Sequence, residues 1–431
     1  MTDKLGNQLH EIGFSNLNAA NAHILFTLRQ ILTYLGVNIL DPKLLSIPSP
    51  LEAKIQLCKN AETLFRSKDD CLRPTIMVTL DEQMLEKRQI IDALLLQGMD
   101  IARINCAHGN EKIWKKMIEI VRHSEQVLMK KELYIGRKCK IYMDLAGPKI
   151  RIGKMGNDST FPNSHKSNFF TLIKDDLLRL YLSEDHLGHP ATEDAPAGVP
   201  VTLAKAFTNV RIHDRIFIDD GKIYGRVENI TQDYIEVKIL TPFSKAAKVK
   251  EGKGINLPDS LLSLNLPALT EKDISDLAFV TKHADLLGIS FVHSPLDLIQ
   301  LKSELKRHSC PHIAVVAKIE TKDAVHQLGR ILLEGLTFEA FGIMIARGDL
   351  AVEVGFENLA FVQDEIISIC QAAHVPTIWA TGVLENLTKK GFPARSELTD
   401  VSQGKRANCL MLNKGTYIVE SLILLKKLLE T

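Results

Sequence analysis

Short apolar runs that end in charged residues are the feature that most constrains how this chain can fold. The runs at 312–317 (His-Ile-Ala-Val-Val-Ala) and 341–345 (Phe-Gly-Ile-Met-Ile) are separated by a helix-length gap. A continuous apolar run of this length is typical of a parallel strand that is buried on both faces. Lys318 and Glu320 follow the first run, and Asp349 follows the second. The sequence therefore predicts charged side chains at the C-terminal ends of strands, where a (β/α) barrel collects its chemistry.

The same alternation of strand-like and helix-like segments predicts eight strands. Three candidates lie at 75–80, 100–105 and 138–144, with a helix at 83–97 between the first two. Five more candidates lie near residues 286, 313, 341, 376 and 408. Eight parallel strands with helices between them are the number that closes a TIM (β/α)8 barrel, so the predicted fold class is α/β.

The alternation is interrupted once and is preceded by a helical segment. Between 151 and 264 the chain is rich in Gly, Pro, Asn and Asp and carries short β-type runs such as 215–218 and 234–238. Ahead of the barrel, an amphipathic pattern from 23 to 40 and a capping box opened by Ser49 predict two helices. We therefore expect four regions: an N-terminal helical extension at 1–70, the first part of the barrel at 71–151, an inserted β domain at 152–264 and the second part of the barrel at 265–431.

Composition limits the classes of function. The 431 residues include 45% hydrophobic and 24% charged side chains, with a formal net charge of +1 and both signs mixed along the chain. This balance gives no general electrostatic attraction to nucleic acid or to an anionic membrane. Seven cysteines occur without a CxxC pair, and residues 1–11 lack an apolar signal region. We therefore expect a cytoplasmic globular protein with reduced thiols.

The charged residues at the two strand ends indicate a metal-assisted reaction. Two carboxylates from neighbouring strand ends, Glu320 and Asp349, can hold one divalent metal ion, and Lys318 between them can neutralise an oxyanion in the same pocket. For either carboxylate alone, capping of the helix that follows is the simpler interpretation. The pair of carboxylates together with the lysine favours an active site.

Six short motifs give the chain a recognisable pattern. In chain order they are residues 102–109 (Ala-Arg-Ile-Asn-Cys-Ala-His-Gly), 144–151 (Asp-Leu-Ala-Gly-Pro-Lys-Ile-Arg), 254–258 (Gly-Ile-Asn-Leu-Pro), 317–320 (Ala-Lys-Ile-Glu), 346–350 (Ala-Arg-Gly-Asp-Leu) and 380–381 (Ala-Thr). Their order resembles that of pyruvate kinases from about residue 74 to the C-terminus. The resemblance implies a barrel interrupted after its third strand by a β-barrel lid domain, with phosphoenolpyruvate bound at the barrel mouth under the lid.

The resemblance also implies roles for the residues around the substrate. Glu320 and Asp349 match the family's ligands for Mg²⁺ or Mn²⁺, and Lys318 matches the lysine that stabilises the transferring phosphoryl group and the enolate. Thr381 matches the threonine beside the substrate carboxylate, and Gly348 with Asp349 starts a helix whose N–H groups can bind that carboxylate. The implied catalytic residues are Lys318, Thr381 and Arg103.

A second set of matches lies on the nucleotide side of the implied site. Arg103 and Arg151 match arginines that contact transferred or nucleotide phosphates, where the fork of a guanidinium group suits phosphate oxygens. His108 matches a residue that lines the nucleotide region. Lys253 and Asp219, in the insert, resemble lid contacts to the nucleotide, although a solvated lysine and a hairpin turn explain them equally well. The implied monovalent-cation region comprises Asn105, Asp144 and Lys149.

Several positions depart from the family pattern. Potassium-dependent members have a serine ligand and a glutamate where this chain has Ala107 and Lys149, so a tethered ammonium is expected to replace potassium. The loop 79–83 (Thr-Leu-Asp-Glu-Gln) lacks the family's Gly-Pro turn and puts two carboxylates near the nucleotide phosphates. Residues 413–416 (Asn-Lys-Gly-Thr) replace a Ser-Gly-Glu-Thr motif. The chain ends one helix later, so the family's C-terminal domain, with its sugar-phosphate effector site, is expected to be absent.

Three functions are consistent with these observations. The leading hypothesis is a glycolytic pyruvate kinase that moves the phosphoryl group of phosphoenolpyruvate to ADP, giving pyruvate and ATP, with Mg²⁺ and without K⁺. A metal-dependent aldolase or lyase acting through a pyruvate enolate would use Glu320 and Asp349 but would not need the lid, Arg151 or Thr381. The third hypothesis is a pseudoenzyme that serves as a ligand-binding or scaffold protein. The expected partners are small molecules, and barrel contacts are the expected route to a homo-oligomer.

Overall fold

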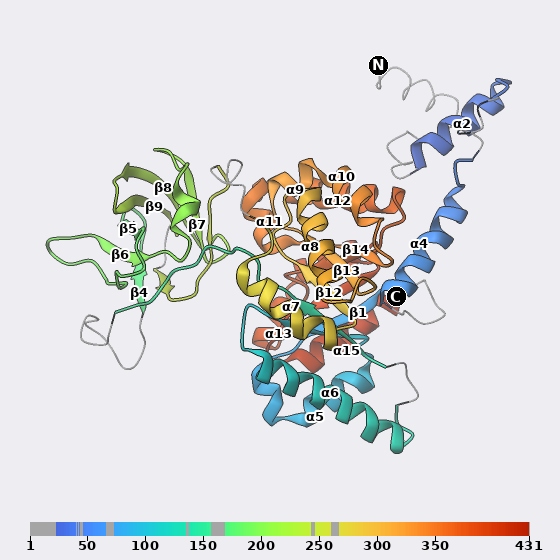
Figure 1. The fold of residues 1–431 in the computed structure, drawn as a ribbon, viewed down its shortest axis with the longest axis horizontal. Coiled ribbons are helices and arrows are strands. Elements are labelled where there is room, and N and C mark those ends of the chain that lie inside the picture. Colours follow the sequence, from blue (N-terminus) through green and yellow to red (C-terminus); the bar gives the residue numbers. More distant parts are fainter. Residues whose placement is uncertain are drawn as a thin grey trace.

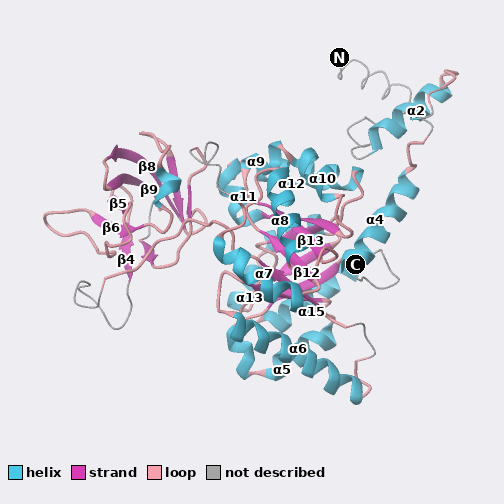
Figure 2. Cartoon of the chain, viewed as in Figure 1, coloured by secondary structure: helices cyan, strands magenta, loops and turns pink. Residues whose placement is uncertain are grey.

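Eight parallel strands close into a barrel in the computed structural model, which describes residues 23–430 except 40, 42, 44–45, 66–72, 135–137, 157–168, 243–245 and 260–266. Around the barrel the strands follow the order β1-β2-β3-β12-β13-β14-β15-β16, and β16 pairs with β1. Figure 2 shows the barrel strands in magenta with helices around them in cyan. Their bounds are β1 (Thr75–Thr79), β2 (Ile101–Asn105), β3 (Lys140–Asp144), β12 (Leu286–Ile289), β13 (Ala314–Ile319), β14 (Phe341–Ala346), β15 (Thr377–Ala380) and β16 (Cys409–Leu412). The predicted TIM (β/α)8 barrel is therefore confirmed.

Helices follow the barrel strands and pack around them (Figure 1). They are η3 (Glu82–Glu86), α5 (Arg88–Gln97), α6 (Glu111–Lys130), α7 (Glu271–His283), α8 (Pro295–Arg307), α9 (Lys322–His326), α10 (Leu328–Gly335), α11 (Arg347–Val354), α12 (Leu359–Ala372), α13 (Glu385–Lys390), α14 (Arg395–Gly404) and α15 (Ile418–Glu430). The single helix predicted at 83–97 is wrong in one respect. It is divided into η3 and α5, because the backbone of Lys87 leaves the helical region with φ −126° and ψ 65°.

The two-residue period of the strands decides which side chains enter the barrel. On β13, Val316 belongs to the cluster of residues inside the barrel, whereas Val315 and Ala317 pack in the larger core outside it. Successive side chains of a strand point to opposite faces, so Lys318 shares the inward direction of Val316. By the same parity, Arg103 on β2 follows the inward-facing Ile101. On these two strands, the inward-facing charged residues Lys318 and Arg103 therefore follow the apolar inward-facing residues, toward the C-terminal end.

The lid is an all-β domain that leaves the barrel after β3 and returns before α7. It contains β4 (Phe169–Leu172), β5 (Leu177–Tyr181), β6 (Ala197–Pro200), η5 (Ala204–Phe207), β7 (Arg215–Ile218), β8 (Ile223–Ile230), β9 (Tyr234–Thr241), β10 (Ala247–Lys250) and β11 (Ile255–Asn256). Six strands form one sheet in the order β11-β7-β8-β9-β5-β6, and β10 pairs with β4. Figure 1 shows the lid to one side of the barrel, joined to it by two segments. The predicted insertion after the third strand is confirmed.

Within the described residues, the N-terminal extension contains α2 (Ile24–Tyr34) and α4 (Pro50–Phe65), which project from the barrel on the side away from the lid (Figure 1). The predicted capping box is present, because Glu52 N–H donates to Ser49 Oγ and the Glu52 carboxylate accepts from Ser49 N–H at 2.8 Å. Leu64 and Phe65, at the end of α4, join the cluster of side chains inside the barrel. No helix within the described ranges is both long and apolar enough to span a membrane.

Candidate active site

A cavity of about 210 Å³ opens at the C-terminal ends of the barrel strands, next to the segments that lead into and out of the lid. Nine of the residues predicted for the site line this cavity: Arg103, Asn105, Lys149, Arg151, Lys318, Glu320, Gly348, Asp349 and Thr381. Asp144 lies beneath them in contact with two of these residues. His108, Asp219 and Lys253 are not among the lining residues.

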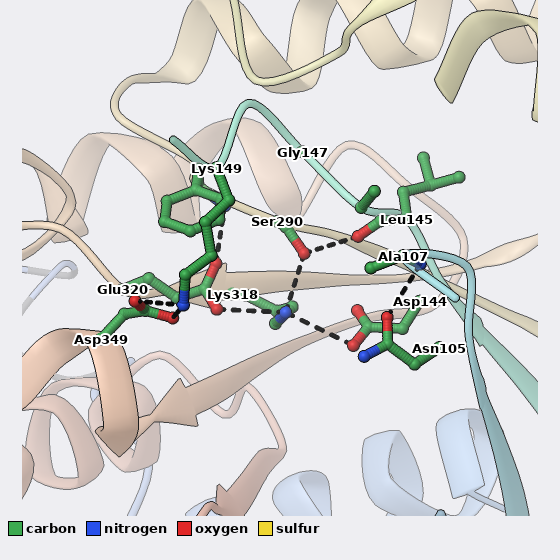
Figure 3. A network of polar contacts seen from close by, with 12 residues as sticks. Asn105, Ala107, Asp144, Leu145, Gly147, Lys149, Ser290, Lys318, Glu320 and Asp349 are labelled. Atoms are coloured by element: carbon green, nitrogen blue, oxygen red, sulfur yellow. Dashed lines mark hydrogen bonds and ion pairs between the residues drawn. The ribbon is translucent and has the colours of Figure 1, made fainter. Parts of the chain in front are cut away.

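Lys318 is a buried cation at the end of β13, with only 8% of its surface exposed. Its ammonium donates to Ser290 Oγ at 2.7 Å and lies 3.3 Å from Asp144 Oδ2 and 3.1 Å from Glu320 Oε1 (Figure 3). Burial opposes protonation of this lysine, but the two carboxylates outweigh it and raise the pKa of Lys318. The lysine is therefore a fixed positive charge, which suits it to stabilising an oxyanion.

Arg103 on β2 shares Asp144 with Lys318. The Nε group of Arg103 donates to Asp144 Oδ2 at 3.1 Å, and its Nη1 group donates to Thr79 Oγ1 at 3.0 Å. Asp144 is only 1% exposed. Burial alone would raise the pKa of Asp144, but Lys318 and Arg103 outweigh burial and lower it. This ionised carboxylate anchors two cations, both of which line the cavity.

Glu320 and Asp349 are the two carboxylates of the cavity. Glu320 Oε2 accepts from Phe291 N–H at 2.8 Å, and Asp349 Oδ1 accepts from Asn256 Nδ2 at 3.1 Å. Burial raises the pKa of Glu320, and the neighbouring charge of Asp349 adds to this effect. Burial acts in the same direction on Asp349, but Lys149 outweighs it and lowers the pKa of that group. Two carboxylates close enough to interact in this way are placed to share a cation.

Lys149 reaches the site from the segment that leads into the lid. Its Nζ atom lies 2.8 and 3.0 Å from the two carboxylate oxygens of Asp349 (Figure 3). It also lies 3.4 Å from Asp220 Oδ1. Burial opposes protonation, but Asp349 and then Asp220 raise the pKa of Lys149. The sequence interpretation grouped Lys149 with Asn105 and Asp144 in a monovalent-cation region. Its ion-pair partners in the structure are Asp349 and Asp220.

The start of α11 and the end of β15 approach each other closely on one side of the cavity. A side-chain carbon added at Gly348 would lie 3.0 Å from Thr381 Cγ2. Thr381 has a left-handed backbone conformation with φ 65°. Arg347 braces this turn, because its Nε donates to Ala380 O at 2.9 Å, its Nη2 donates to Thr381 O and its guanidinium lies 4.2 Å from the Trp379 ring centre. The unpaired N–H groups of the first turn of α11 make this corner suitable for a small carboxylate.

Of the residues predicted for the nucleotide, Arg103 and Arg151 line the cavity, whereas His108, Lys253 and Asp219 do not. Arg151 Nη1 donates to Gly252 O at 2.9 Å, which ties it to the segment returning from the lid. Lys253 Nζ and Asp219 Oδ1 lie 2.6 Å apart and pair with each other within the lid. His108 lies at the surface, where partial burial and then nearby cations lower its pKa. The structure therefore gathers the predicted substrate residues more tightly than the predicted nucleotide residues.

A larger cavity of about 470 Å³ lies near the opposite end of the barrel, against α4. Its lining includes Lys54, Arg73 and Lys405 and, among the residues that the structure describes, no carboxylate. It therefore lacks the closely paired acidic and basic groups that line the smaller cavity and that often mark a functional site. The smaller cavity at the strand C-termini is the candidate active site despite its size.

Comparison with known proteins agrees with this geometry. Residues 72–422 match a family model described as the barrel domain of pyruvate kinase. The chain belongs to the pyruvate kinase family. It is 33% identical to a pyruvate kinase of Thermococcus litoralis over 353 residues, which cover 80% of this chain and 67% of that protein. It is 31% identical to a pyruvate kinase of Mycobacterium intracellulare over 333 residues, which cover 77% of this chain and 63% of that protein.

A third relative, from Thermotoga maritima, is 29% identical over 350 residues, which cover 80% of this chain and 67% of that pyruvate kinase. The chain thus matches about two thirds of the length of these curated relatives. Pyruvate kinases are phosphotransferases. The buried cations at the barrel mouth are consistent with membership of this family, because phosphoryl transfer depends on fixed positive charge.

The residues present fit the divalent metal ion that the pyruvate kinase family implies. Mg²⁺ in phosphotransferase sites is held by one or two protein carboxylates, with water and substrate phosphates completing its octahedron. Glu320 and Asp349 supply two carboxylates in one cavity. Within the described part of the chain, no group of three or more His, Cys, Asp or Glu side chains is arranged to hold a metal. The donor set therefore suits a site that substrate oxygens complete.

Several residues in contact with the predicted site were not themselves predicted as site residues, among them Ser290, Asp220, Asn256 and Arg347. Asn256 and Arg347 lie within motifs that carry the resemblance to pyruvate kinases, so the motifs alone were sufficient to include them. Ser290 directly follows β12, and the strand-end rule that located Lys318 applies to it as well. No pattern in the sequence distinguishes Asp220 from other turn residues of the lid.

Proposed function

We propose that the protein is a pyruvate kinase that transfers the phosphoryl group of phosphoenolpyruvate to ADP, giving pyruvate and ATP. The observation that carries this proposal is the buried ammonium of Lys318, held between Asp144 and Glu320 at the end of β13. Transfer from an enol oxygen concentrates negative charge on closely spaced oxygens, so cations in fixed positions lower the barrier. Membership of the pyruvate kinase family supports the same reaction.

The proposed substrate half of the site is formed by the barrel. Lys318 and Arg103 stabilise negative charge on the transferring phosphoryl group and on the enolate that it leaves. Gly348 and Thr381 border the substrate carboxylate, next to the N–H groups of the first turn of α11. These four residues line one cavity, which supports their action on one small anion.

The metal ion and the nucleotide complete the proposed site. A Mg²⁺ or Mn²⁺ ion held by Glu320 and Asp349 would supply positive charge beside the transferring group. Arg151 is assigned to a nucleotide phosphate because it lines the cavity on the lid side. Lys253 and Asp219 are assigned to lid contacts with the nucleotide, which they would make by exchanging their mutual ion pair for contacts with the ligand.

We also propose that the reaction does not need potassium. Position 107 is an alanine, and Asn105 Oδ1 already accepts from the Ala107 N–H at 3.0 Å. Asp144 is engaged by the cations of Arg103 and Lys318. Lys149 adds a protein-bound positive charge to the same cavity. These features support a site in which ammonium groups of the protein supply the positive charge that a bound potassium ion would otherwise provide.

A ligand-binding pseudoenzyme is the second candidate function. It is favoured by the ammonium of Lys149, which lies on the proposed metal ligand Asp349. It is also favoured by the carboxylates of Asp81 and Glu82, which stand where the family has an uncharged turn. Asp81 Oδ2 lies 3.9 Å from Lys414 Nζ, so one of these negative charges faces a cation. A protein of this kind would bind phosphoenolpyruvate with metal but form no ATP.

ATP formation from phosphoenolpyruvate and ADP is the decisive measurement. The assay contains Mg²⁺ with tetramethylammonium as the monovalent cation, and potassium is added in a second series. We expect ATP formation that potassium raises by less than about twofold, and a loss of about 100-fold or more in Lys318→Met, because a fixed transition-state cation is removed. Lys282→Met, at an exposed position of α7, is the control. Phosphoenolpyruvate binding without ATP formation would instead support the pseudoenzyme.

The metal assignment has its own test. Glu320→Gln keeps the shape of the side chain but removes a charge from the site of a hard cation, so the Mg²⁺ concentration needed for half-maximal phosphoenolpyruvate binding should rise by about tenfold or more. The measurement is a calorimetric or fluorescence titration of phosphoenolpyruvate at a series of Mg²⁺ concentrations. An unchanged Mg²⁺ dependence in this variant would remove Glu320 from the metal site.

A further inference from the structure

We propose that Lys149 is an internal cation that occupies the metal position at Asp349, and that a divalent metal ion must displace it in order to bind. The inference rests on the assignment of Asp349 and Glu320 as metal ligands under the proposed function, and it adds a role for the lysine. Lys149 then acts as a positioning residue whose location depends on whether the metal is bound.

The carboxylate of Asp349 is already occupied by the ammonium of Lys149. Lys149 Nζ bridges both carboxylate oxygens, at 2.8 and 3.0 Å, and Oδ1 also accepts from Asn256 Nδ2 at 3.1 Å. Mg²⁺ binds a carboxylate oxygen at about 2.0–2.1 Å, where it uses the same lone pairs and repels a neighbouring ammonium. The lysine and the metal ion are therefore alternative occupants of this carboxylate.

The positive and negative side chains of the cavity balance one another. Without metal, each carboxylate has its own ammonium: Glu320 has Lys318, and Asp349 has Lys149. Adding a dication to this balanced set would leave an excess of positive charge in a buried place, which is costly unless one ammonium leaves. Lys318 is held by three acceptors and is enclosed within the barrel. Lys149 is the cation that can leave.

A second carboxylate, that of Asp220, lies within reach of the Lys149 ammonium. Its Nζ atom lies 3.4 Å from Asp220 Oδ1, and the side chain of Asp220 is 58% exposed. A shift of the ammonium away from Asp349 toward Asp220 therefore keeps one ion pair and moves the charge toward solvent, while it stays at the same cavity, which Asp220 also lines. The relocated charge no longer competes with the metal ion, and its desolvation is smaller.

The absence of a side chain at Gly254 leaves space for the aliphatic part of the Lys149 side chain. Lys149 lies across the segment returning from the lid, and a side-chain carbon added at Gly254 would be only 2.4 Å from Lys149 Cε. Gly254 pairs with Arg151 in an antiparallel bridge, and Asp219 N–H donates to Gly254 O at 3.0 Å. Because Gly254 has no side chain, the aliphatic part of Lys149 can lie against it. The hydrogen bond from Asp219 holds the turn that carries Asp220 next to Gly254. Figure 3 shows the side chain of Lys149 extending from the segment that carries Gly147 toward Asp349.

Binding of Mn²⁺ in the absence of substrates tests the proposal without any measurement of catalysis. The free Mn²⁺ is measured by electron paramagnetic resonance during titration of the full chain. We expect Lys149→Met to bind Mn²⁺ about tenfold more tightly than the wild type, because the competing ammonium is gone. Lys222→Met is the matched control, since it removes an exposed lysine from the same lid turn without touching Asp349. Its affinity should stay within about twofold of the wild type.

A second pair of variants separates displacement from a simple effect of charge. Asp220→Asn removes the destination of the ammonium, so it should weaken Mn²⁺ binding about threefold in the wild-type background. The same change should have no effect in Lys149→Met, because no ammonium then needs a destination. Equal weakening in both backgrounds would show a general field effect and would overturn the proposal. Since Asp220 is at the surface, this variant also guards against misfolding as an explanation.

The remaining outcomes distinguish the two levels of inference. If Glu320→Gln weakens Mn²⁺ binding but Lys149→Met behaves like Lys222→Met, the metal site stands and the role of Lys149 is overturned. If Glu320→Gln and Asp349→Asn both leave Mn²⁺ binding unchanged, the metal assignment fails and the role of Lys149 fails with it. Tighter binding in Lys149→Met together with a background-dependent effect of Asp220→Asn supports displacement.

Discussion

At the scale of single residues, the barrel mouth is built from buried charges that neutralise one another. Burial of an unpaired charge is expensive, and removal of one partner of a buried pair typically costs about 3–5 kcal/mol. The pairs at this site are Arg103 with Asp144, Lys318 with Glu320 and Lys149 with Asp349. Replacement of one of these groups leaves its partner unpaired and destabilises the fold, so a loss of activity in such variants must be separated from a loss of stability.

Glu353 provides a prediction at this scale. It lies on α11, is 5% exposed, and burial followed by the charge of Asp349 raises its pKa from 4.5 to about 8. The folded state therefore binds a proton that the unfolded state releases above pH 4.5. The stability linked to this proton is complete below pH 4.5. Between pH 4.5 and about 8 the free energy of unfolding falls by about 1.4 kcal/mol per pH unit, and above about 8 this contribution is lost. Glu353→Gln should remove this loss.

Urea denaturation at pH 6, 7 and 8 checks the expectation. The free energy of unfolding of Glu353→Gln, relative to the wild type, should increase with pH across this range. Glu357→Gln serves as the control, because Glu357 is an exposed carboxyl group shortly after the same helix. A constant difference between Glu353→Gln and the wild type at all three pH values would contradict a neutral Glu353 in the folded protein.

At the scale of elements, α4 closes the end of the barrel opposite the active site. Leu64 is fully buried among the side chains inside the barrel, and a side-chain carbon added at Gly342 would lie 2.4 Å from Leu64 Cδ2. Lys140 Nζ donates to Thr63 O at 3.1 Å, and Asn60 Nδ2 donates to His374 O at 2.7 Å. The helix is thus packed and hydrogen-bonded to the strand N-termini, and it forms part of the barrel core.

Leu64→Ala should therefore destabilise the barrel by about 2–5 kcal/mol, because it leaves a cavity in a close-packed interior. Ile55→Ala is the matched control on the same helix, where the side chain is 47% exposed. We expect the control to change stability by less than about 0.5 kcal/mol. Thermal and urea denaturation measure both variants. A loss in Leu64→Ala no larger than that in Ile55→Ala would mean that the barrel is stable without this helix.

At the scale of the whole molecule, the candidate site is shared unequally between barrel and lid. The barrel supplies the proposed substrate and metal residues from rigid strand ends, whereas the lid contributes through two connecting segments that carry Lys149, Arg151 and Asn256. The turn at Gly221 packs against Phe356, since a side-chain carbon there would lie 2.8 Å from Phe356 Cζ. The nucleotide side therefore depends more on how the lid sits on the barrel than the substrate side does, where only Asp349 has contacts with Lys149 and Asn256 among those described above.

This division predicts unequal binding of two ligands. Oxalate, a planar mimic of the pyruvate enolate, should bind with Mg²⁺ more tightly than ADP does, because the sequence predicts that Asp81 and Glu82 place negative charge near the nucleotide phosphates. Each charge is worth on the order of 1 kcal/mol in a partly desolvated cleft, and the Asp81→Asn/Glu82→Gln double variant should therefore strengthen ADP binding by about tenfold or more. Oxalate affinity should be unchanged in that variant.

Calorimetry with Mg²⁺ present measures both ligands on both proteins. Wild-type ADP binding as tight as oxalate binding would contradict the division into two halves. An equal gain for oxalate and ADP in the double variant would show that the two carboxylates act on the net charge of the cavity rather than on the nucleotide phosphates.

The eight strands were predictable because their signals are local. An apolar run buried on both faces, and the charged residue that ends it, lie within a few positions of each other, and the two-residue period then sets the inward direction of Lys318. The division of the helix predicted at 83–97 was not predictable, because the amphipathic pattern continues through Lys87 while the backbone does not. Apolar periodicity responds to burial, and it does not detect a single residue that leaves the helical region.

The sequence by itself determined the barrel, the insertion after its third strand and the identity of most residues at the barrel mouth, because these depend on short-range patterns and on motif spacing. Only the tertiary structure decided the partners of Lys149 and the position of α4. Lys149 and Asp349 are 200 residues apart in the chain, and the choice between Asp144 and Asp349 as partner depends on how the connecting segments cross at Gly254. A long, flexible side chain takes the partner that long-range packing brings within its reach, and no local pattern encodes that distance.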